Sequence, residues 1–494
     1  MYKIAIIGSG FSSLSAAAIL AREGFEVTIY EKNDQPGGRA RTWESGGFCF
    51  DMGPSWYWMP EVFENYFALF GKKVSDYYRL VRIDPSYRVW FAKNDAIDVP
   101  AGMAELEQLF EAVEPGSTPS LKKFLEEAAY KYRVSMQDYV FRPSLSILEF
   151  LEPRLLIQAL RIELLTSMRK HVRKYFKDPR LVSLLEFPVL FLGATPQNTP
   201  AMYSLMNYAD LVLGTWYPMG GMHQVVNAMV SVAAAQGVKF RLNTAVKHIV
   251  VTGDKASAIE TDQGIFQADL VLSGADYEHT DQQLLAGKFR GYSTRYWESR
   301  TLSPSCLIFY LGINKKLSDA RHHQLFFDQD FGRHAHEIYE QPVWPSKPLF
   351  YVSCSSVTDP GVAPAGCENL FFLMPLAPGL PDNDELREKY FEIMITRFET
   401  VTGERIRDSI MVKRSYALND FTTDYHSFKG NAYGLANTLL QTAFLKPKMR
   451  SKKVKNLFYT GQLTVPGPGV PPAIISGQVA AKEVIRYLKG KQRE

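Results

Sequence analysis

Cysteine is scarce in this sequence, and long hydrophobic runs are missing. The four cysteines form no Cys-x-x-Cys pair and lack the spacing of metal ligands: Cys49, Cys306, Cys354 and Cys367. A chain of 494 residues needs no disulfide bonds to fold, so we expect a reducing compartment and no metal centre. No apolar run approaches the roughly 18–20 residues that cross a bilayer. The N-terminus also has no signal-peptide pattern. We therefore expect a cytoplasmic protein without a membrane-spanning segment.

The sequence also lacks an excess of charge of one sign. Its 56 basic and 52 acidic residues give a formal net charge of +4, too small an excess to indicate a nucleic-acid-binding protein. Hydrophobic residues make up 46% of the chain and charged residues 22%, as in ordinary globular proteins. These proportions exclude disordered, collagen-like and coiled-coil proteins. The length is typical of a globular enzyme with two or three domains.

The N-terminal residues have the pattern of a βαβ unit. Residues 3–7 (KIAII) predict a buried parallel strand, and residues 25–30 (FEVTIY) predict a second strand. Between them, residues 12–23 (SSLSAAAILARE) predict a helix that ends at Gly24. Two parallel strands joined by a helix begin a nucleotide-binding fold. We therefore expect an α/β protein with a Rossmann-like domain.

The turn between the first strand and the helix is rich in glycine. It reads Gly8-Ser9-Gly10-Phe11-Ser12-Ser13. Gly8 suits a tight turn, and Gly10 lets the backbone approach a pyrophosphate at the N-terminus of the helix. Ser13 replaces the usual third glycine, but its small side chain still permits close packing of helix and strand. We predict that Gly8, Ser9, Gly10, Ser12 and Ser13 bind a dinucleotide. An ordinary glycine-rich turn is the alternative.

Charged residues follow the second strand. Glu31 lies where an acidic side chain can accept hydrogen bonds from ribose hydroxyl groups, and Lys32 follows it directly. A second glycine turn, Gly37-Gly38-Arg39-Ala40-Arg41, brings two guanidinium groups to the same edge of the sheet, where they suit phosphate. We predict that Glu31, Lys32, Gly38, Arg39 and Arg41 bind the nucleotide. The alternatives are a solvated carboxylate at the strand end and an exposed basic loop.

The C-terminal residues predict a second part of the same site. Residues 456–460 (NLFYT) predict a strand, and a loop rich in glycine and proline (GQLTVPGPGVPP) joins it to a helix over residues 473–488. Pro471 and Pro472 suit the first turn of that helix. The N-terminus of a helix stabilises an anion, and a reduced flavin is anionic. We predict cofactor contacts from three residues of this region: Gly461, Gly469 and Val470. A tight turn before a surface helix is the alternative.

Five segments carry a similarity to a known family: GSGFSSL, EKNDQPGGRAR, FDMGPSWYW (residues 50–58), YPMGGM (217–222) and YTGQLTVPGPGVPP. Together they resemble the bacterial-type phytoene desaturases, carotenoid-forming members of the amine-oxidase-like flavoprotein superfamily. The resemblance covers almost the whole chain and implies an FAD enzyme that introduces double bonds into a long polyene. Many members have His-Pro-Gly where this chain has Val465-Pro466-Gly467, so a role for that histidine is not transferred.

The resemblance also implies a division into domains. In that family Val246 would contact the adenine end of FAD, and a core valine is the alternative. We expect a Rossmann-like FAD-binding domain with a discontinuous mixed α+β substrate domain and a helical membrane-facing part. The predicted bounds are 1–75, 214–284 and 446–494 for the FAD-binding domain, 76–140, 178–213 and 285–445 for the substrate domain, and 141–177 for the helical segment.

Two basic stretches predict contact with a membrane surface. Residues 154–177 combine seven basic residues with leucine, isoleucine and methionine, the pattern of a basic amphipathic helix. Residues 446–455 add further cations, which would be attracted to anionic lipid. Because a carotene is insoluble in water, the enzyme would need a peripheral membrane contact; a solvated helix packed on a domain is the alternative. Both stretches lack the aromatic platforms of RNA-binding proteins, so we expect no nucleic-acid partner.

The middle of the chain lacks a second nucleotide-binding unit. No further strand, GxGxxG turn and helix occur in succession there. We therefore expect no bound nicotinamide cofactor, and the electron acceptor would be oxygen or a quinone.

Glu149 is the predicted catalytic residue. It lies in the apolar segment 144–151, where burial would raise its pKa and prepare it for proton transfer. In related carotene desaturases the corresponding segment carries an acidic residue with a proposed catalytic role. The alternatives place Glu149 on the polar side of an amphipathic helix or leave the chemistry to the flavin alone.

We therefore expect FAD-dependent desaturation of an acyclic carotene, most simply phytoene to products such as lycopene. Within the same scaffold, the alternatives are a later-pathway 3,4-desaturase of hydroxylated carotenoids and a carotene isomerase without net oxidation. An amine oxidase is more distant and would need a polar or aromatic cage beside the flavin. A carotenoid or lipid carrier would use the same apolar groove without flavin turnover. The sequence does not indicate an oligomeric state.

Overall fold

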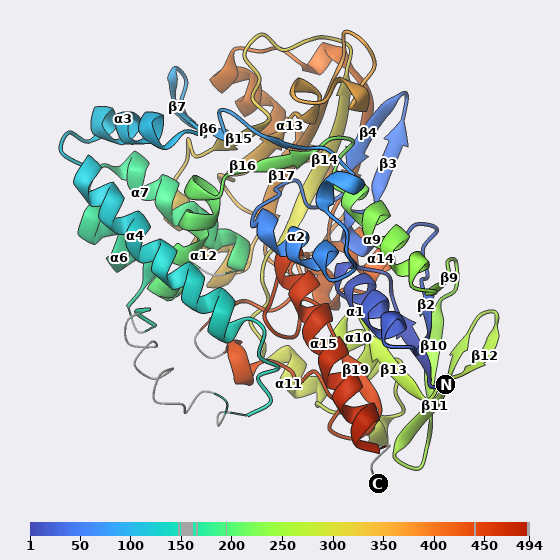
Figure 1. Cartoon of the computed structure of the whole chain (residues 1–494). Helices are drawn as coiled ribbons and strands as arrows, with labels where there is room; N and C mark the ends of the chain where they lie inside the picture. The colour runs from blue at the N-terminus through green and yellow to red at the C-terminus, as the bar shows by residue number, and fades with distance from the viewer. Residues whose placement is uncertain (147–148, 150–161, 165, 194, 439–440, 492–494) are drawn as a thin grey trace.

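The computed structural model of the protein describes residues 1–146, 149, 162–164, 166–193, 195–438 and 441–491. Figure 1 shows a part built on a parallel sheet with α15 beside it, a part built on a second large sheet, and a group of helices to one side. The molecule is therefore a mixed α/β protein, as the sequence predicts.

The parallel sheet has five strands in the order β19-β13-β1-β2-β9, and every neighbouring pair is parallel. Its strands are β1 (Lys3–Ile7), β2 (Glu26–Tyr30), β9 (Lys239–Arg241), β13 (Leu270–Ser273) and β19 (Leu457–Tyr459). All five lie in the three segments predicted for the FAD-binding domain. The domain bounds themselves stay a prediction.

Three helices cover one face of this sheet: α1 (Phe11–Arg22), α9 (His223–Ala235) and α15 (Val470–Lys491). Figure 1 shows α1 between the other two. The hydroxyl group of Ser15 in α1 donates a hydrogen bond to the carbonyl oxygen of Ile474 in α15, at 2.9 Å. Pro471 and Pro472 occupy the first turn of α15, as predicted. The two ends of the chain thus build one layer of the fold.

A small antiparallel sheet covers the other face. It consists of β10 (Val246–Thr252), β11 (Lys255–Thr261) and β12 (Gly264–Gln267). Ile249 and Ile259 of this sheet belong to the same apolar cluster as Val271 of β13. The helix α10 (Tyr277–Gln282) follows β13, and its Tyr277 ring stacks on Tyr459 with ring centroids 3.7 Å apart. The parallel sheet is therefore buried on both faces, as expected for parallel strands.

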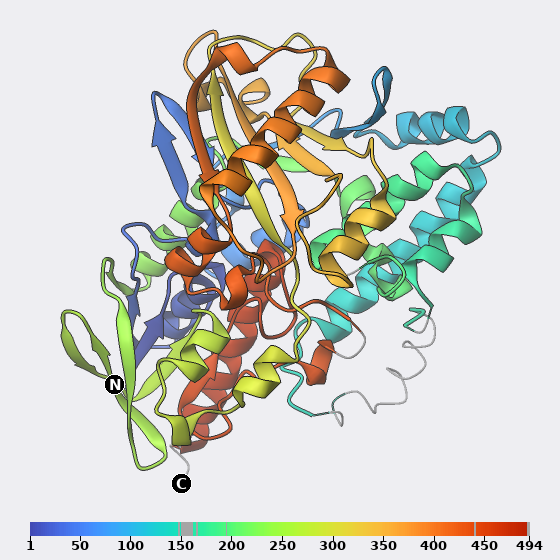
Figure 2. The same ribbon diagram turned by 180° about the vertical axis from the view of Figure 1, so that it is seen from behind.

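The second large sheet has seven strands in the order β18-β14-β17-β16-β15-β6-β7. They are β6 (Tyr87–Ala92), β7 (Asp95–Val99), β14 (Ser305–Ile313), β15 (His323–Phe326), β16 (Phe350–Ser353), β17 (Glu368–Leu376) and β18 (Ile410–Tyr416). The helix α13 (Asp384–Thr402) packs on one face through Phe391 and Phe398 (Figure 2). Side chains on the opposite face are free to line a site between the two sheets.

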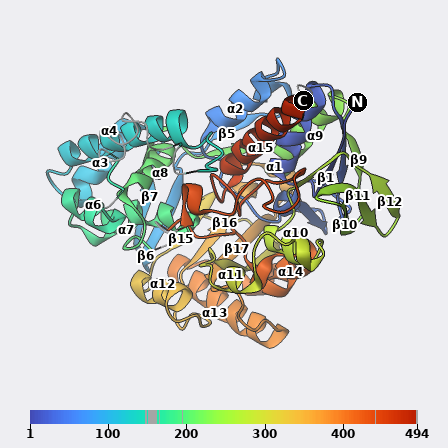
Figure 3. The same cartoon turned by 90° about the horizontal axis from the view of Figure 1, so that it is seen from below.

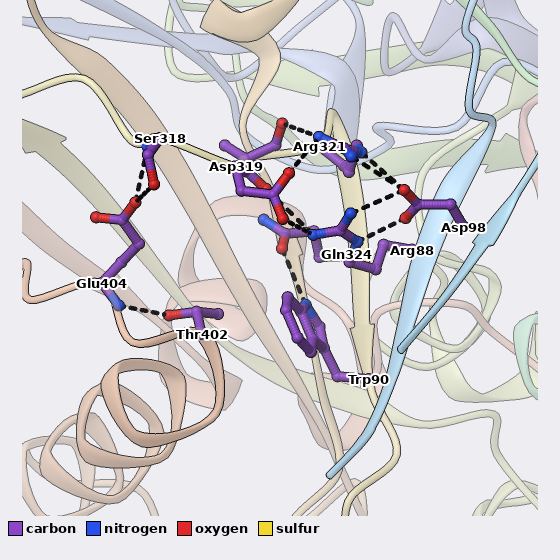
Figure 4. Close-up of polar contacts among 10 residues, drawn as sticks. Arg88, Trp90, Asp98, Ser318, Asp319, Arg321, Gln324, Thr402 and Glu404 are labelled. Carbon is purple, nitrogen blue, oxygen red and sulfur yellow. Dashed lines mark hydrogen bonds and ion pairs between the residues drawn. The ribbon is translucent and has the colours of Figure 1, made fainter. Parts of the chain in front are cut away.

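An ion-pair network secures the edge of this sheet (Figure 4). Arg88 of β6 contacts the carboxylate of Asp98 in β7 through Nε and Nη2, at 2.5 and 2.8 Å, and also pairs with Asp319. Arg321 contacts both carboxylates, at 3.0 Å from Asp98 and 2.8 Å from Asp319. The Arg88 side chain is only 9% exposed. The network joins the β6-β7 hairpin to the segment before β15.

Several helices gather beside the seven-stranded sheet (Figure 3). They are α3 (Met103–Val113), α4 (Thr118–Val134), α6 (Met168–Tyr175), α7 (Pro179–Glu186), α8 (Leu205–Asn207) and α12 (Phe331–Tyr339). Further strands of the described chain are β3 (Thr42–Ser45), paired with β4 (Phe48–Asp51), and β5 (Leu80–Arg82), paired with β8 (Trp216–Pro218). Further α-helices there are α2 (Pro60–Ala68), α11 (Thr294–Glu298) and α14 (Leu418–Tyr425).

The prediction of one basic helix over residues 154–177 is wrong. Within that stretch, residues 154–161 and 165 lie outside the described part, and the helix α6 covers only Met168–Tyr175. Glu163 has a left-handed backbone (φ 57°), and Ser167 caps α6 by accepting a hydrogen bond from Lys170 N–H. These two features separate residues 162–164 from the helix. Within α6, Met168, His171 and Val172 are buried, whereas Lys170, Arg173 and Lys174 are exposed.

Candidate cofactor and substrate cavities

A long cavity lies beyond the ends of β1, β2 and β13, where the two large sheets face each other. Most of the predicted cofactor residues line it: Gly8, Ser9, Gly10, Ser12, Glu31, Lys32, Gly38, Arg39, Val246, Gly461, Gly469 and Val470. The structure therefore brings together the two ends of the chain and the start of β10. In open parallel sheets, ligands bind in a crevice at this end of the strands.

The first glycine turn has the shape that the sequence predicts. Gly8 has a left-handed backbone (φ 82°), and a Cβ there would lie 3.4 Å from the amide nitrogen of Ala275. Gly10 precedes α1, and a Cβ at this position would contact no atom within 4 Å among the described residues. Because Gly10 lines the cavity, the side chain of any other residue there would enter the cavity.

Glu31 is held in place by the same turn. Its Oε2 accepts hydrogen bonds from the amide and the hydroxyl group of Ser9, at 2.9 and 2.7 Å. Its Oε1 accepts from the amide of Asn33 at 2.9 Å. An ionised carboxylate offers about four acceptor positions, so one remains for a ribose hydroxyl group.

Two predicted cofactor residues do not line the cavity. The hydroxyl oxygen of Ser13 points toward Gly274, where a Cβ would lie 2.0 Å from it. Arg41 forms an ion pair with Asp424 at 2.5 Å and lies over the ring of Tyr425. The structure thus gives Ser13 a role in packing α1 against the end of β13. Arg41 attaches the second glycine turn to α14. Whether either residue contacts the cofactor stays a prediction.

Arg39 is the cation that the second glycine turn places on the cavity wall. Its Nη2 donates a hydrogen bond to the hydroxyl group of Ser427 at 2.5 Å. Its buried Nε has no hydrogen-bond partner among the residues that the structure describes. Burial lowers the pKa of Arg39, which leaves a desolvated guanidinium group beside the space for a cofactor. An anionic group in the cavity would satisfy it.

Two histidines on the same wall were not predicted from the sequence. His279 of α10 and His426, just after α14, stack with ring centroids 4.0 Å apart and planes 9° apart. Both line the cavity together with Lys32. Burial first, and then the neighbouring His426 and Lys32, lower the pKa of His279 to about 3. The pair is therefore neutral at ordinary pH. Isolated histidines so far apart in the chain give no sequence pattern.

A second cavity continues from the first. The two share six lining residues: Gly53, Pro54, Leu373, Tyr433, Gly469 and Val470. Beyond these shared residues, the wall is mainly aromatic and aliphatic, with Trp56, Trp58, Met59, Phe187, Met206, Leu325, Phe327, Phe331, Ile338 and Phe350. No Asp, Glu, Lys or Arg occurs among the described residues of this wall. The second cavity suits a long apolar molecule whose one end meets the cofactor space.

Glu149, the predicted catalytic residue, is not among the described residues that line either cavity. Its carboxylate accepts hydrogen bonds from the amides of Ser144, Leu145 and Ser146, at 3.1, 2.7 and 3.2 Å. Its main-chain carbonyl accepts from Arg142 at 2.6 Å. The side chain therefore stabilises a local turn, and a catalytic role stays a prediction.

The first cavity fits FAD. It offers an open approach at Gly10, a carboxylate with a free acceptor position, and an Nε of Arg39 that has no partner among the described residues. The residues of the first glycine turn and Glu31 would hold the adenosine and pyrophosphate. The shared residues from Gly53 to Val470 would lie where the flavin meets the second cavity. Bound FAD would supply a two-electron oxidant at this junction.

Comparison with known proteins assigns the chain to a family. Residues 11–485 match the family described as flavin containing amine oxidoreductase, and the chain belongs to this family. The protein is an FAD-dependent oxidoreductase with the fold that the sequence predicts.

Known relatives and a solved structure match over nearly the full length. The chain is 39% identical to a carotenoid 3,4-desaturase of Haloarcula japonica, over 98% of both chains. It is 31% identical to a zeta-carotene-forming phytoene desaturase of Myxococcus xanthus, over 98% of this chain and 94% of that one. The crystal structure of an oxidoreductase from Methanosarcina mazei shares the fold, with a TM-score of 0.65 and 17% identity over 97% of this chain and 100% of that one.

Proposed function

We propose that the protein is a carotenoid desaturase that introduces double bonds into an acyclic carotene. The observation that carries this proposal is the apolar second cavity, which opens directly onto the cofactor space. Relatives with nearly full coverage are named for carotenoid desaturation, which supports the same substrate class. A polyene is long, narrow and apolar, and it would place one C–C bond at the junction while the rest of the chain fills the aromatic cavity.

The first candidate substrate is phytoene, and the second is a later intermediate of carotenoid synthesis. The relative at 39% identity is named for 3,4-desaturation, which favours a substrate that is already partly unsaturated. Expression in cells that accumulate phytoene, and separately in cells that accumulate lycopene, tests both candidates. Red pigment from phytoene supports the first candidate, and a red-shifted product from lycopene supports the second. Unchanged pigments in both hosts, with FAD-loaded protein present, would contradict the proposal.

The composition of the second cavity weighs against an amine oxidase. An ammonium substrate bound beside the flavin is stabilised most directly by an acidic side chain. The described wall of the second cavity holds no carboxylate. A carrier without chemistry remains compatible with an apolar cavity. Anaerobic bleaching of the flavin absorbance by added carotene separates an enzyme from a carrier, because a carrier leaves the flavin oxidised.

We also propose that the protein acts at the surface of a membrane, with oxygen or a quinone as the electron acceptor. No helix among the described residues is long and apolar enough to span a bilayer. Leu145 and Leu445 are 37% and 40% exposed. The ammonium group of Lys448 joins their two segments by donating to the carbonyl oxygens of Leu145 and Phe444, at 2.9 and 2.8 Å. Each of these two exposed leucines would add apolar surface that enters the interface of a bilayer.

The basic stretch 446–455 contributes less to such a surface than its sequence predicts. Lys446 is only 2% exposed, and burial lowers its pKa to about 7. Lys448 is engaged by main-chain carbonyl groups, and Lys455 pairs with Asp254 at 2.5 Å. The exposed cations Lys170 and Lys174 of α6 remain available for anionic lipid, whereas the exposed Arg173 lies 3.8 Å from the carboxylate of Glu186.

A further inference from the structure

Three polar side chains lie in series at the junction of the two cavities. The hydroxyl groups of Ser55 and Tyr351 are 3.0 Å apart, and the Tyr351 hydroxyl group is 2.5 Å from Nδ1 of His323. Ser55 follows the shared residue Pro54 in the chain, and Tyr351 pairs in the sheet with the shared residue Leu373. Ser55 and Tyr351 line the second cavity, and His323 lies behind them. The series therefore runs from the apolar cavity into the core.

The His323 ring is fixed in a single plane by its neighbours. It stacks on Trp56 with ring centroids 4.2 Å apart and planes 8° apart, and it meets His322 edge to face at 4.4 Å. The residue is fully buried, and its Nε2 has no hydrogen-bond partner in the described parts of the chain. Burial, and then the nearby His322, lower the pKa of His323, so its imidazole is neutral. A neutral imidazole has one nitrogen that can accept a proton.

Desaturation needs such an acceptor near the cofactor. The other titratable groups among the described residues of the second cavity are His334, Tyr339 and Tyr433. Both ring nitrogens of His334 are engaged, with Nε2 at 3.1 Å from the carbonyl oxygen of Pro375 and Nδ1 at 3.0 Å from the amide of Leu349. Among the described lining groups, Tyr351 alone combines contact with the cavity and a hydrogen bond to a histidine.

We propose that Tyr351 is the catalytic residue that receives the substrate proton and that His323 accepts the proton of the Tyr351 hydroxyl group in the same step. This inference rests on the proposed desaturase function. One substrate C–H bond would break with its electron pair, and bound FAD would supply the two-electron oxidant that takes up this hydride. On the neighbouring carbon, the C–H electron pair becomes the second bond of the new C=C. Its proton passes to the Tyr351 oxygen, and the Tyr351 proton passes to Nδ1 of His323. Ser55 positions the Tyr351 hydroxyl group.

The principal test is anaerobic single-turnover reduction of the FAD-loaded protein by substrate. Tyr351→Phe keeps the ring but removes the hydroxyl group, and it should lower the rate constant by roughly 100-fold, a typical contribution of acid–base catalysis. His323→Asn keeps an acceptor near Nδ1 that cannot be protonated, so it should lower the rate constant by a similar factor. Tyr66→Phe is the matched control, because Tyr66 is buried, lines neither cavity, and its hydroxyl group has no partner among the described residues.

The two main variants should alter the rate without altering binding. FAD content and the substrate dissociation constant from spectral titration should stay within about threefold of the parent protein. The parent reaction should be slower in D₂O, because an exchangeable tyrosine proton moves in the rate-limiting step, and Tyr351→Phe should lose that dependence. A solvent isotope effect that persists in Tyr351→Phe would overturn the proposal.

A readout without turnover tests the Tyr351–His323 pair itself. In protein labelled with ¹⁵N-histidine, the Nδ1 resonance of His323 should have the shift of a hydrogen-bonded acceptor. That resonance should move in Tyr351→Phe and stay unchanged in Tyr66→Phe. A parent protein that reduces its flavin, together with a Tyr351→Phe rate within threefold, would overturn the relay and leave the desaturase function intact. A parent protein that no carotene reduces would instead contradict the desaturase function.

Discussion

The α-carbon of Gly477 in α15 lies against the main-chain carbonyl group of Ser12 in α1, so close that a Cβ at position 477 would lie 2.2 Å from that oxygen. Backbone atoms cannot move aside as a flexible side chain can. The close approach of these two helices therefore depends on a glycine at this position, and it sets the place of the first glycine turn relative to the C-terminal loop.

We expect Gly477→Ala to destabilise the protein and weaken FAD binding together. Separating α1 and α15 should cost about 1–3 kcal/mol, as for other overpacked sites. Thermal unfolding with and without added FAD measures the change. The matched control is Gly490→Ala in the same helix, where a Cβ would contact nothing within 4 Å. That substitution should be neutral or stabilising, by up to about 1 kcal/mol. Equal effects of the two substitutions would contradict the interpretation.

Gly10→Val should weaken FAD binding strongly without unfolding the chain. The backbone at Gly10 is extended (φ −68°, ψ 172°), and its Cβ direction is open, so the folded chain can accept a side chain there. The valine would occupy the approach to the pyrophosphate, and we expect the FAD dissociation constant to rise by at least roughly 100-fold. Flavin fluorescence titration measures this constant. Gly10→Ala should have a smaller effect in the same direction. Unchanged FAD binding by Gly10→Val would contradict the assignment of the first cavity as the cofactor site.

Asp98→Asn should destabilise the edge of the seven-stranded sheet. It removes the carboxylate that joins Arg88 and Arg321 (Figure 4), and it leaves the buried Arg88 guanidinium with Asp319 as its only remaining carboxylate in this network. Because Asp98 is one-third exposed, we expect a loss of about 1–3 kcal/mol, less than for a fully buried pair. Urea unfolding measures this loss. The exposed Asp262→Asn is the control and should change stability by less than about 0.5 kcal/mol.

The exposed side chains of Leu145 and Leu445 should govern membrane contact. We expect the double variant Leu145→Glu/Leu445→Glu to reduce flotation with anionic vesicles, because charged side chains do not enter the apolar interface. Neutralising Lys170, Arg173 and Lys174 should weaken flotation at low salt more than at high salt. Ile265→Glu/Met411→Glu changes two other exposed apolar residues, 63% and 61% exposed, and should leave flotation unchanged. Flotation that survives both sets of changes would place the membrane contact elsewhere.

Glu149→Gln separates the sequence-based catalytic candidate from Tyr351. Because the Glu149 carboxylate accepts three amide hydrogen bonds in a turn, we expect the rate of flavin reduction to stay within a few-fold of the parent protein. Thermal stability should fall slightly, since a neutral amide accepts weaker hydrogen bonds. Single-turnover reduction measures the rate. A loss of roughly 100-fold with FAD and substrate still bound would instead identify Glu149 as a general base.

The elements with regular local patterns were predictable from the sequence. The expected strand at residues 3–7 is β1, and the expected helix over residues 12–23 differs from α1 by one residue at each end. The predicted C-terminal helix begins three residues later than α15, because the loop before it contains Pro471 and Pro472 and its last residues already have helical conformation. Strong hydrophobic periodicity, close glycine turns and prolines at a helix start act over a few residues. These features can therefore be recognised from the sequence alone.

The long basic helix and most of the substrate site were not predictable in this way. The sequence pattern of residues 154–177 is typical of one helix, but Glu163 has a left-handed backbone, and α6 begins only after it. The carboxylate of Glu163 pairs with Lys131, which is distant in the sequence, at 2.7 Å. Tyr351 and His323 meet because β15 and β16 pair in one particular register. The residues around each strand do not predict that register. Lys446 has the sequence context of a surface lysine, and tertiary packing buries it.

The contact between the first and last segments of the chain has a consequence for biosynthesis. β1, α1 and the glycine turn are synthesised long before α15 and the loop from Gly461 to Val470, which complete their cavity. A nascent chain therefore carries half of a nucleotide site with no opposite wall. FAD capture becomes a late event, and it reports that synthesis has continued through α15. Chains that terminate early would stay colourless even when their N-terminal half has folded.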